Sequence, residues 1–463
     1  MSNCASTNCV SVTVHPPPTA TVSGSTTVCP GHSASIQVTL TGAPPWTVTW
    51  SDGLITNYTI RSSGRTVTPS STTNFTITAL SDAICSDGTF SGSATVTVNT
   101  NGPTSSVVVS NEVLVVYNSN TNFPDSAACK DYYINHRPGF SNANVLACSC
   151  TTFGVDGFES ITSNNLANQI INPIISFIQS NQTKSIHYVV LMYGMPSRVS
   201  DGPITCSPAG SCGLASVQHH ISRCMSEAGY TSGPYYEGSA CPYASTNYLG
   251  TTCLVTALNM ATLADCTAYV DKVTSMYTNN VIISAEAAGY TNTNYYLDDT
   301  LNVSQDGGLA VGFRNQILAE NPSANVTYTS NTIITAGSSV KGYAGWGIHN
   351  NVFTNTYAVD GEVIWSGSSN KWWIIETFES FNGQRACSQG CVERWFASNA
   401  WGGANYMNTP VGAVSNVEEP FGTGLNGPTY MSLWEQGFLF SECAWASEQT
   451  PCFQAIGDPL VKQ

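Results

Sequence analysis

The hydrophobic pattern of the chain changes near residue 100, and this change constrains the fold more than any other feature. Across residues 18–100, apolar and polar residues alternate in short stretches such as ASIQVTL and GSATVTVN, with turn residues between them. This pattern predicts an all-β sandwich. From residue 107 the candidate strands, such as VLVVYN and IHYVVLMYG, are continuously apolar and alternate with helical patterns. That order predicts an α/β domain with a parallel sheet.

The domain boundaries follow from the same pattern. We expect a β-sandwich over residues 18–100, a linker at 101–106 and the α/β domain over 107–463. Cysteine and small residues are frequent from about 200 to 270, which predicts a disulfide-pinned excursion from the α/β domain. Asp125 is the expected N-cap of the first helix of that domain.

Charged residues are scarce in this chain. It has 14 Lys and Arg against 29 Asp and Glu, a formal net charge of −15, and only 9% charged residues. Binding to nucleic acid or to an anionic membrane needs clustered basic residues, so both are excluded as partners. The sequence also has no apolar run near the roughly 20 residues of a membrane-spanning helix, so we expect no membrane insertion.

The chain has 17 cysteines, which is many for a cytosolic enzyme. This number predicts disulfides and an extracellular or cell-surface location. Spacing makes Cys387 with Cys391, and Cys443 with Cys452, candidate pairs. Zinc binding is the competing interpretation, but it needs a second matching cysteine pair, and none is evident.

The first domain has the order Cys29, then Trp46 or Trp50, then Cys85. Cysteine, tryptophan and cysteine follow each other in this way in an immunoglobulin-like core. The segment therefore resembles the bacterial Ig-like repeats of surface and secreted proteins. The resemblance implies that Cys29 and Cys85 form the bridge between the two sheets.

Residues 1–17 resemble the end of the same repeat, because Cys4 aligns with Cys85 and the strand that follows each is similar. We expect this segment to be the remnant of a preceding Ig-like repeat. The alternative is that it donates a strand to the Ig-like domain of a second copy, since a free β edge invites such pairing.

The second domain carries several strings in a fixed order: VLVVYNSNTNFPDSAACKDYYINHRPGF, IHYVVLMYGMPSRV, YAGWG, GAVSNVEEPF and GDPLV. Together they resemble a family of secreted bacterial proteins that is similar in layout to gingipain-type, caspase-fold cysteine peptidases. The resemblance covers most of residues 107–463. It implies a caspase-like α/β sandwich and, in an active member, a His and a Cys at the ends of neighbouring core strands.

The peptidase dyad is missing from the matching positions. In YAGWG the place of the His is taken by Trp346, and the strand KWWIIETF is followed by Glu379 and Ser380 instead of a Cys. His349 lies three residues beyond Trp346. A rebuilt hydrolytic site would therefore use His349, Glu379 and Ser380 as its catalytic residues. The alternative is that His349 is an ordinary loop residue.

Acidic residues cluster at Asp298, Asp299 and Asp306. Such a cluster could bind calcium through several oxygen ligands, although it lacks the spacing of an EF-hand loop. The alternative is a solvated acidic turn. We expect no other cofactor.

Three charged residues, Arg198, Glu419 and Asp458, lie in the strings shared with the resembling family. In a charge-poor domain such residues indicate either a binding pocket or a buried ion pair.

These observations favour a secreted or cell-surface structural or binding protein with a catalytically silent caspase-like domain. Self-assembly through Ig-like strand pairing, up to a filament, is one version of this hypothesis. The alternatives are a secreted hydrolase rebuilt around His349 and an adhesin or glycan-binding module. The expected partners are accordingly another copy of the chain, or an extracellular protein or glycan.

Overall fold

The computed structural model divides into two compact units, Met1–Thr100 and Asn101–Gln463. It is rich in strands, with several sheets and a smaller set of helices. The structure describes residues 15–28, 34–69, 71–98, 107–201, 205–206, 210–211, 216–225, 253–276, 281–285, 292–300, 309–349, 353–367, 371–387, 389–419, 427–447 and 450–463. Residues 1–14, with most of the predicted donor strand, lie outside these ranges, as do Cys29 and Asp306.

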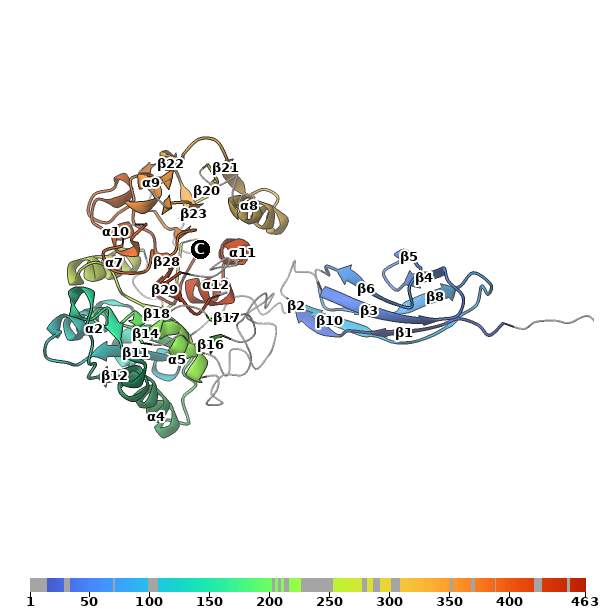
Figure 1. Cartoon of the computed structure of the whole chain (residues 1–463), viewed down its shortest axis with the longest axis horizontal. Helices are drawn as coiled ribbons and strands as arrows, with labels where there is room; N and C mark the ends of the chain where they lie inside the picture. Colours follow the sequence, from blue (N-terminus) through green and yellow to red (C-terminus); the bar gives the residue numbers. More distant parts are fainter. Residues whose placement is uncertain are drawn as a thin grey trace, which may run out of the picture. The chain divides into compact units, whose positions relative to one another are not determined.

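The first unit contains only strands among its described residues (Figure 1). They form three sheets with the orders β6-β3-β1-β9, β2-β10-β7 and β5-β4-β8. The strands are β1 (Thr19–Ser23), β2 (Thr26–Val28), β3 (Ala34–Thr41), β4 (Trp46–Trp50), β5 (Ile55–Tyr58), β6 (Ser62–Val67), β7 (Thr73–Phe75), β8 (Ile77–Ser81), β9 (Thr89–Gly92) and β10 (Ala94–Val98).

One hydrophobic core holds these sheets together. In β3, buried and exposed residues alternate strictly, because successive side chains of a strand point to opposite faces. Trp46 and Trp50 are each 1% exposed within this core. The Trp46 indole N–H also donates to the Thr41 carbonyl at 2.9 Å, which satisfies its one polar atom.

The second unit is built on one ten-stranded sheet with the order β12-β11-β14-β18-β29-β28-β27-β23-β20-β21. Its strands are β11 (Val113–Asn118), β12 (Asn144–Cys148), β14 (Tyr188–Leu191), β18 (Leu254–Ala257), β20 (Asn294–Asp298), β21 (Asn325–Thr329), β23 (Val340–Gly345), β27 (Ile374–Thr377), β28 (Gly412–Asn416) and β29 (Phe453–Gly457). The helices used below are α2 (Pro124–His136), α4 (Asn172–Ser180), α5 (Val217–Met225), α7 (Leu263–Ser275), α8 (Leu309–Glu320), α11 (Gly427–Glu435) and α12 (Phe440–Ser447).

The sheet consists of two parallel halves that run in opposite directions. All neighbouring strands pair in parallel except β28 and β29, which pair antiparallel at the centre. When the five strands of each half are numbered in the order in which the chain forms them, both halves have the same arrangement. From the outer edge of the sheet to its centre, the order is 2-1-3-4-5 in each half. Figure 1 shows α2, α4 and β11 of the first half in cyan to green, and β20, β23 and α8 of the second half in gold to orange.

One face of the sheet centre is covered by α11 and α12. A Cβ atom on Gly412 of β28 would lie 2.2 Å from the Phe440 ring of α12. A Cβ atom on Gly342 of β23 would lie 2.8 Å from the Tyr295 ring and 3.4 Å from Met431 Sδ of α11. The two glycines therefore allow the helices to pack directly on the strands.

Two local expectations need correction. The predicted excursion at about 200–270 contains a core strand of the sheet, β18, which pairs in parallel with β14. Asp125 is not the N-cap of α2, because Phe123 holds that position and Asp125 lies in the first turn.

No helix among the described residues is long and apolar enough to span a bilayer.

Candidate functional site

A cavity of about 400 Å³ opens at the carboxyl ends of β11, β14 and β18. In the first half of the sheet, the strand that follows β11 in the chain, β12, lies on one side of β11, and the next core strand, β14, lies on the other side of β11. Parallel α/β sheets place their ligand sites at such a reversal of strand order. We call this feature the switch-point cavity. It is lined by Asn122, Phe123, Pro124, Asp125, Ser126, Asp156, Phe158, Tyr193, Gly194, Ala261 and Thr262.

Three aromatic rings form one wall of the switch-point cavity. Phe158 meets Phe123 edge-on with 6.0 Å between ring centroids, and it meets Tyr193 edge-on at 5.1 Å. Phe158 is buried, whereas Phe123 and Tyr193 are half-buried. Burial raises the pKa of the Tyr193 phenol to about 12, so this group keeps its proton at neutral pH.

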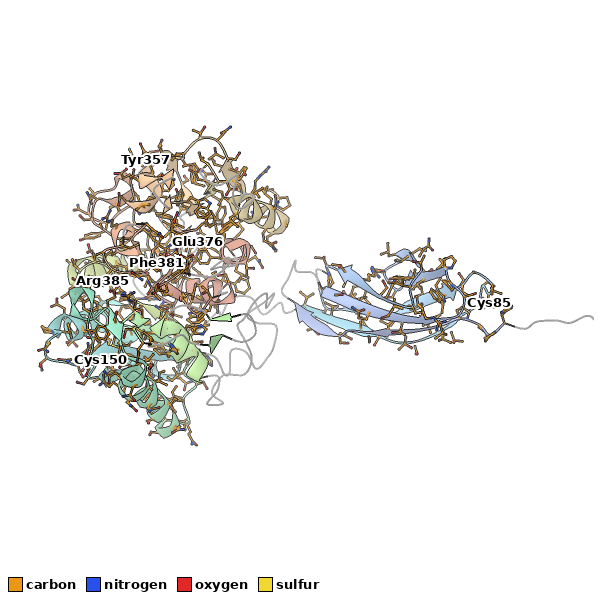
Figure 2. The ribbon with its side chains drawn as sticks, in the orientation of Figure 1. Cys85, Cys150, Tyr357, Glu376, Phe381 and Arg385 are labelled. Atoms are coloured by element: carbon orange, nitrogen blue, oxygen red, sulfur yellow. The ribbon has the colours of Figure 1, made fainter. Side chains whose placement is uncertain are left out.

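Arg385 supports this wall from behind. Its guanidinium carbon lies 4.8 Å from the centroid of Phe158 and 5.6 Å from that of Tyr193. Its side chain, 3% exposed, donates from Nε to Asp156 at 2.6 Å. Its other nitrogens donate to Asn259 Oδ1 and to the carbonyls of residues 260 and 261, which follow β18. Arg385 follows β27 in the chain, and its hydrogen bonds join the loops that form the cavity. Figure 2 labels Arg385 among the side chains of this unit.

The backbone around Arg385 is strained. Asp156, Phe381 and Ala386 have φ angles of 55°, 62° and 55°, in the left-handed region that non-glycine residues rarely adopt. Such residues persist only where the surrounding contacts hold them, and they cluster at functional sites.

Replacing Arg385 with lysine should lower the free energy of unfolding by about 1–3 kcal/mol, because an ammonium cannot reproduce the planar fork of hydrogen bonds. Urea unfolding followed by tryptophan fluorescence measures this loss. The matched control is Arg394→Lys. Arg394 is 53% exposed and is paired with Asp360 at the surface, so its replacement should change stability by less than about 0.5 kcal/mol. Equal effects of the two substitutions would contradict the role given to Arg385.

The predicted catalytic residues lie at the ends of β23 and β27. Glu379 is fully buried, and its Oε1 accepts the backbone N–H of Gly347 at 2.8 Å. Burial raises the pKa of Glu379 to about 8. The Ser380 hydroxyl donates to Gln389 Oε1 at 3.2 Å. His349 is in β24 (Ile348–His349), two residues after Gly347, and its side chain is outside the described part of the structure.

Asp298 and Asp299 have backbone partners. Asp298 accepts N–H groups of Thr300 and Ile334, and Asp299 accepts those of Ala310 and Val311 at the start of α8. Within the described ranges, no three His, Cys, Asp or Glu side chains are grouped as a metal site. These carboxylates therefore fix a turn and a helix start. The third residue of the predicted calcium cluster, Asp306, lies outside the described residues, so the calcium site stays a prediction.

The same turn occurs in the first half. Asn118 is the last residue of β11, and Asp298 is the last residue of β20. The side chain of each accepts the backbone N–H of the residue two positions later in the chain. Each also accepts one N–H from the segment after the second strand of its half, from Cys150 and Ile334 respectively. The two halves thus share their strand order and the polar residue that closes the first strand.

The structure does not join Arg198, Glu419 and Asp458 in one site. The guanidinium of Arg198 forms ion pairs with Glu159, at 3.8 Å between Nη2 and Oε2, and with Glu418, at 3.7 Å between Nη1 and Oε2. Glu419, the predicted member of the group, is exposed. Asp458 pairs instead with Arg137, a residue that the sequence did not single out and that caps the C-terminus of α2. Nε of Arg137 lies 2.6 Å from Asp458 Oδ2, and both side chains are fully buried.

The predicted disulfides are not formed in the structure. Cys85, Cys387, Cys391, Cys443 and Cys452 are all thiols. Cys391 Sγ donates to the Cys387 carbonyl at 2.9 Å, so a hydrogen bond joins these two adjacent residues. The sulfur atoms of the last pair point to different carbonyl groups.

The Cys443 sulfur atom lies 3.7 Å from the Phe438 carbonyl oxygen, and the Cys452 sulfur atom lies 3.9 Å from the Glu419 carbonyl oxygen.

Sequence reasoning missed the switch-point cavity. Its polar residues come from separate loops, and Arg385 is 229 positions away from Asp156. The available signal was the rule that open α/β sheets bind ligands at the carboxyl ends of their strands. The string NTNFPD, which follows the strand VLVVYN, contains four of the lining residues, and the next residue, Ser126, is a fifth.

Comparisons with known proteins give little. No family model matches the sequence, and no curated protein matches it. One solved structure that is similar is the PKD domain of an M14-like peptidase from Thermoplasmatales archaeon SCGC AB-540-F20. It is 18% identical, with a TM-score of 0.16, and the match covers 18% of this chain and 98% of that chain.

Proposed function

We propose that the chain is a secreted or cell-surface binding protein whose α/β unit is a catalytically silent relative of the caspase fold. The observation that supports this most is the packing at the ends of β23 and β27. There the resembling peptidases have a His and a Cys, whereas this chain has a tryptophan and a buried glutamate. Trp346 packs on Phe378 with 5.5 Å between ring centroids, and Glu379 holds the Gly347 N–H.

The binding role is assigned to the switch-point cavity. The cavity is open, it lies where a parallel sheet places its ligands, and Arg385 fixes its walls. The all-β unit is proposed as an Ig-like spacer, with self-association through residues 1–17 as a further version of its role. The proposed extracellular location is supported by the low content of charged residues, 9% of the chain.

The proposal is tested by incubating the full chain with panels of peptide, ester and glycan substrates. Hydrolysis should stay at the level of the buffer for the wild type and for His349→Ala. Turnover by the wild type that His349→Ala abolishes would overturn the catalytically silent assignment.

One observation favours a second candidate, a secreted hydrolase. A buried glutamate with a pKa near 8, at the end of a core strand, has the protonation behaviour of a general acid. In that case turnover would fall as the pH rises through about 8, and Glu379→Gln would remove both the activity and this pH limb. The absence of turnover in any panel would contradict this candidate.

A further inference from the structure

We propose that the switch-point cavity binds a sugar ring of a neutral carbohydrate. This inference rests on the binding function proposed above and names the ligand class of the same cavity. Its volume of about 400 Å³ lies within the range of roughly 300–1,000 Å³ typical of small-molecule sites. Cavity size alone does not select a ligand, whereas the chemistry of the lining does.

The rim supplies the hydrogen-bonding groups that hydroxyls need. Asn122, Asp125 and Thr262 are exposed at the mouth and come from two different loops. Asp125 offers carboxylate oxygens as acceptors, and the amide of Asn122 offers both a donor and an acceptor. The Thr262 hydroxyl is already engaged, because it donates to Asp265 at 2.6 Å and accepts the Asp265 N–H at 3.1 Å. A sugar hydroxyl both donates and accepts, so a rim of mixed character suits it better than it suits a ligand with only one of these capacities.

The wall supplies an apolar surface. Phe123 and Tyr193 are half-buried, and each is held by edge-on contact with Phe158. The C–H groups on a face of a pyranose ring are apolar and weakly positive, and the face of an aromatic ring is negative. Rings that are fixed before binding also lower the entropic cost of association.

The charges at the cavity favour a neutral ligand. Asp156 forms an ion pair with Arg385, whose side chain is 3% exposed and donates three further hydrogen bonds. The Arg385 Nη2 atom also lies 3.7 Å from Glu393 Oε2, outside the cavity lining. Asp125 then remains as the charged side chain of the lining. An anion would be repelled by Asp125 and by the net charge of −15. A cationic ligand would have to compete with Arg385 for Asp156. Asp125 is then the one carboxylate of the lining that such a ligand could bind without this competition.

The experiment uses the full chain on an array of neutral glycans, followed by calorimetric titration with the methyl pyranosides of the best binders. Binding should be unchanged within about twofold between 0.05 and 0.5 M NaCl, because no ion pair with the ligand is screened. Asp125→Ala should weaken it about tenfold, the usual effect of losing one hydrogen bond to a charged acceptor. Asp125→Asn, which keeps an acceptor oxygen, should weaken it less.

The matched control is Asp131→Ala, an acid on the same helix whose side chain is 63% exposed and which does not line the cavity. It should bind as the wild type does. Thermal melts of both variants should match the wild type, so that a loss of binding is not a loss of folding.

Three outcomes would overturn the inference: no neutral glycan binds, Asp125→Ala binds as well as Asp131→Ala, or the ligand is a cation. The last is checked with methylguanidinium. Binding of that probe, abolished equally by Asp125→Asn and by 0.5 M NaCl, would replace the ligand class but leave the proposed binding function standing. The proposed function fails separately, through turnover in the hydrolysis panels.

Discussion

Replacing Asp458 with alanine should destabilise the α/β unit by about 3–5 kcal/mol. Asp458 and Arg137 are both fully buried, with 2.6 Å between Nε and Oδ2. Asp458 also accepts the Tyr133 hydroxyl at 2.8 Å and the Leu460 N–H at 2.8 Å. Its removal leaves the guanidinium charged in the interior, because arginine does not lose its proton there.

Urea unfolding followed by tryptophan fluorescence measures this effect. Eight of the ten tryptophans lie beyond residue 100, so the signal reports mainly on the α/β unit. Asp131→Ala is the control, since its carboxylate pairs with Lys130 at the surface and should contribute less than about 0.5 kcal/mol. If the unfolding midpoints of Asp458→Ala and Asp131→Ala coincide, Asp458 does not carry the stability assigned to it.

The double substitution Arg137→Met with Asp458→Ala isolates the pair itself. It should cost less than the sum of the two single changes, because neither partner is then left charged and alone. Additive losses would mean that the two side chains act independently.

The sequence predicted the elements of the sheet where local pattern determines them. The runs VLVVYN and IHYVVLMYG are apolar throughout because β11 and β14 are buried on both faces, and both are strands. β18 was missed because its four residues follow a stretch rich in cysteine and glycine, which masks a short strand. Local pattern also cannot show that two parallel halves meet antiparallel at β28 and β29.

The site was less accessible to sequence reasoning for a related reason. Arg137 and Asp458 are 321 positions apart, and their pairing depends on α2 packing near the end of β29. The same holds for Arg385 and Asp156. A charged residue in a charge-poor domain signals that a partner exists, as it did for Asp458, but spacing does not identify the partner. The two disulfides predicted from spacing, Cys387–Cys391 and Cys443–Cys452, failed similarly, because sequence proximity does not fix the direction of a sulfur atom.

Glu379→Gln should make the chain more stable than the wild type, by an amount that grows with pH. Burial raises the pKa of Glu379 from 4.5 to about 8, so between these values the folded state holds a proton that the unfolded state has lost. The contribution of Glu379 to stability is therefore largest below pH 4.5 and falls by up to about 1.4 kcal/mol per pH unit toward pH 8. Glutamine is neutral throughout and can still accept the Gly347 N–H.

The gain should be near zero at pH 4.5 and about 3–5 kcal/mol at pH 8, which urea midpoints at several pH values would show. Glu376 adds a parallel effect, because burial raises its pKa well above 4.5 and its Oε2 has no hydrogen-bond partner among the described atoms. Glu362→Gln, at an exposed position, should leave the pH profile of the wild type unchanged. Parallel profiles for the wild type and Glu379→Gln would show that Glu379 is ionised in the folded protein. Its carboxylate would then be a base at neutral pH, which would also remove the argument for a general acid at the end of β27.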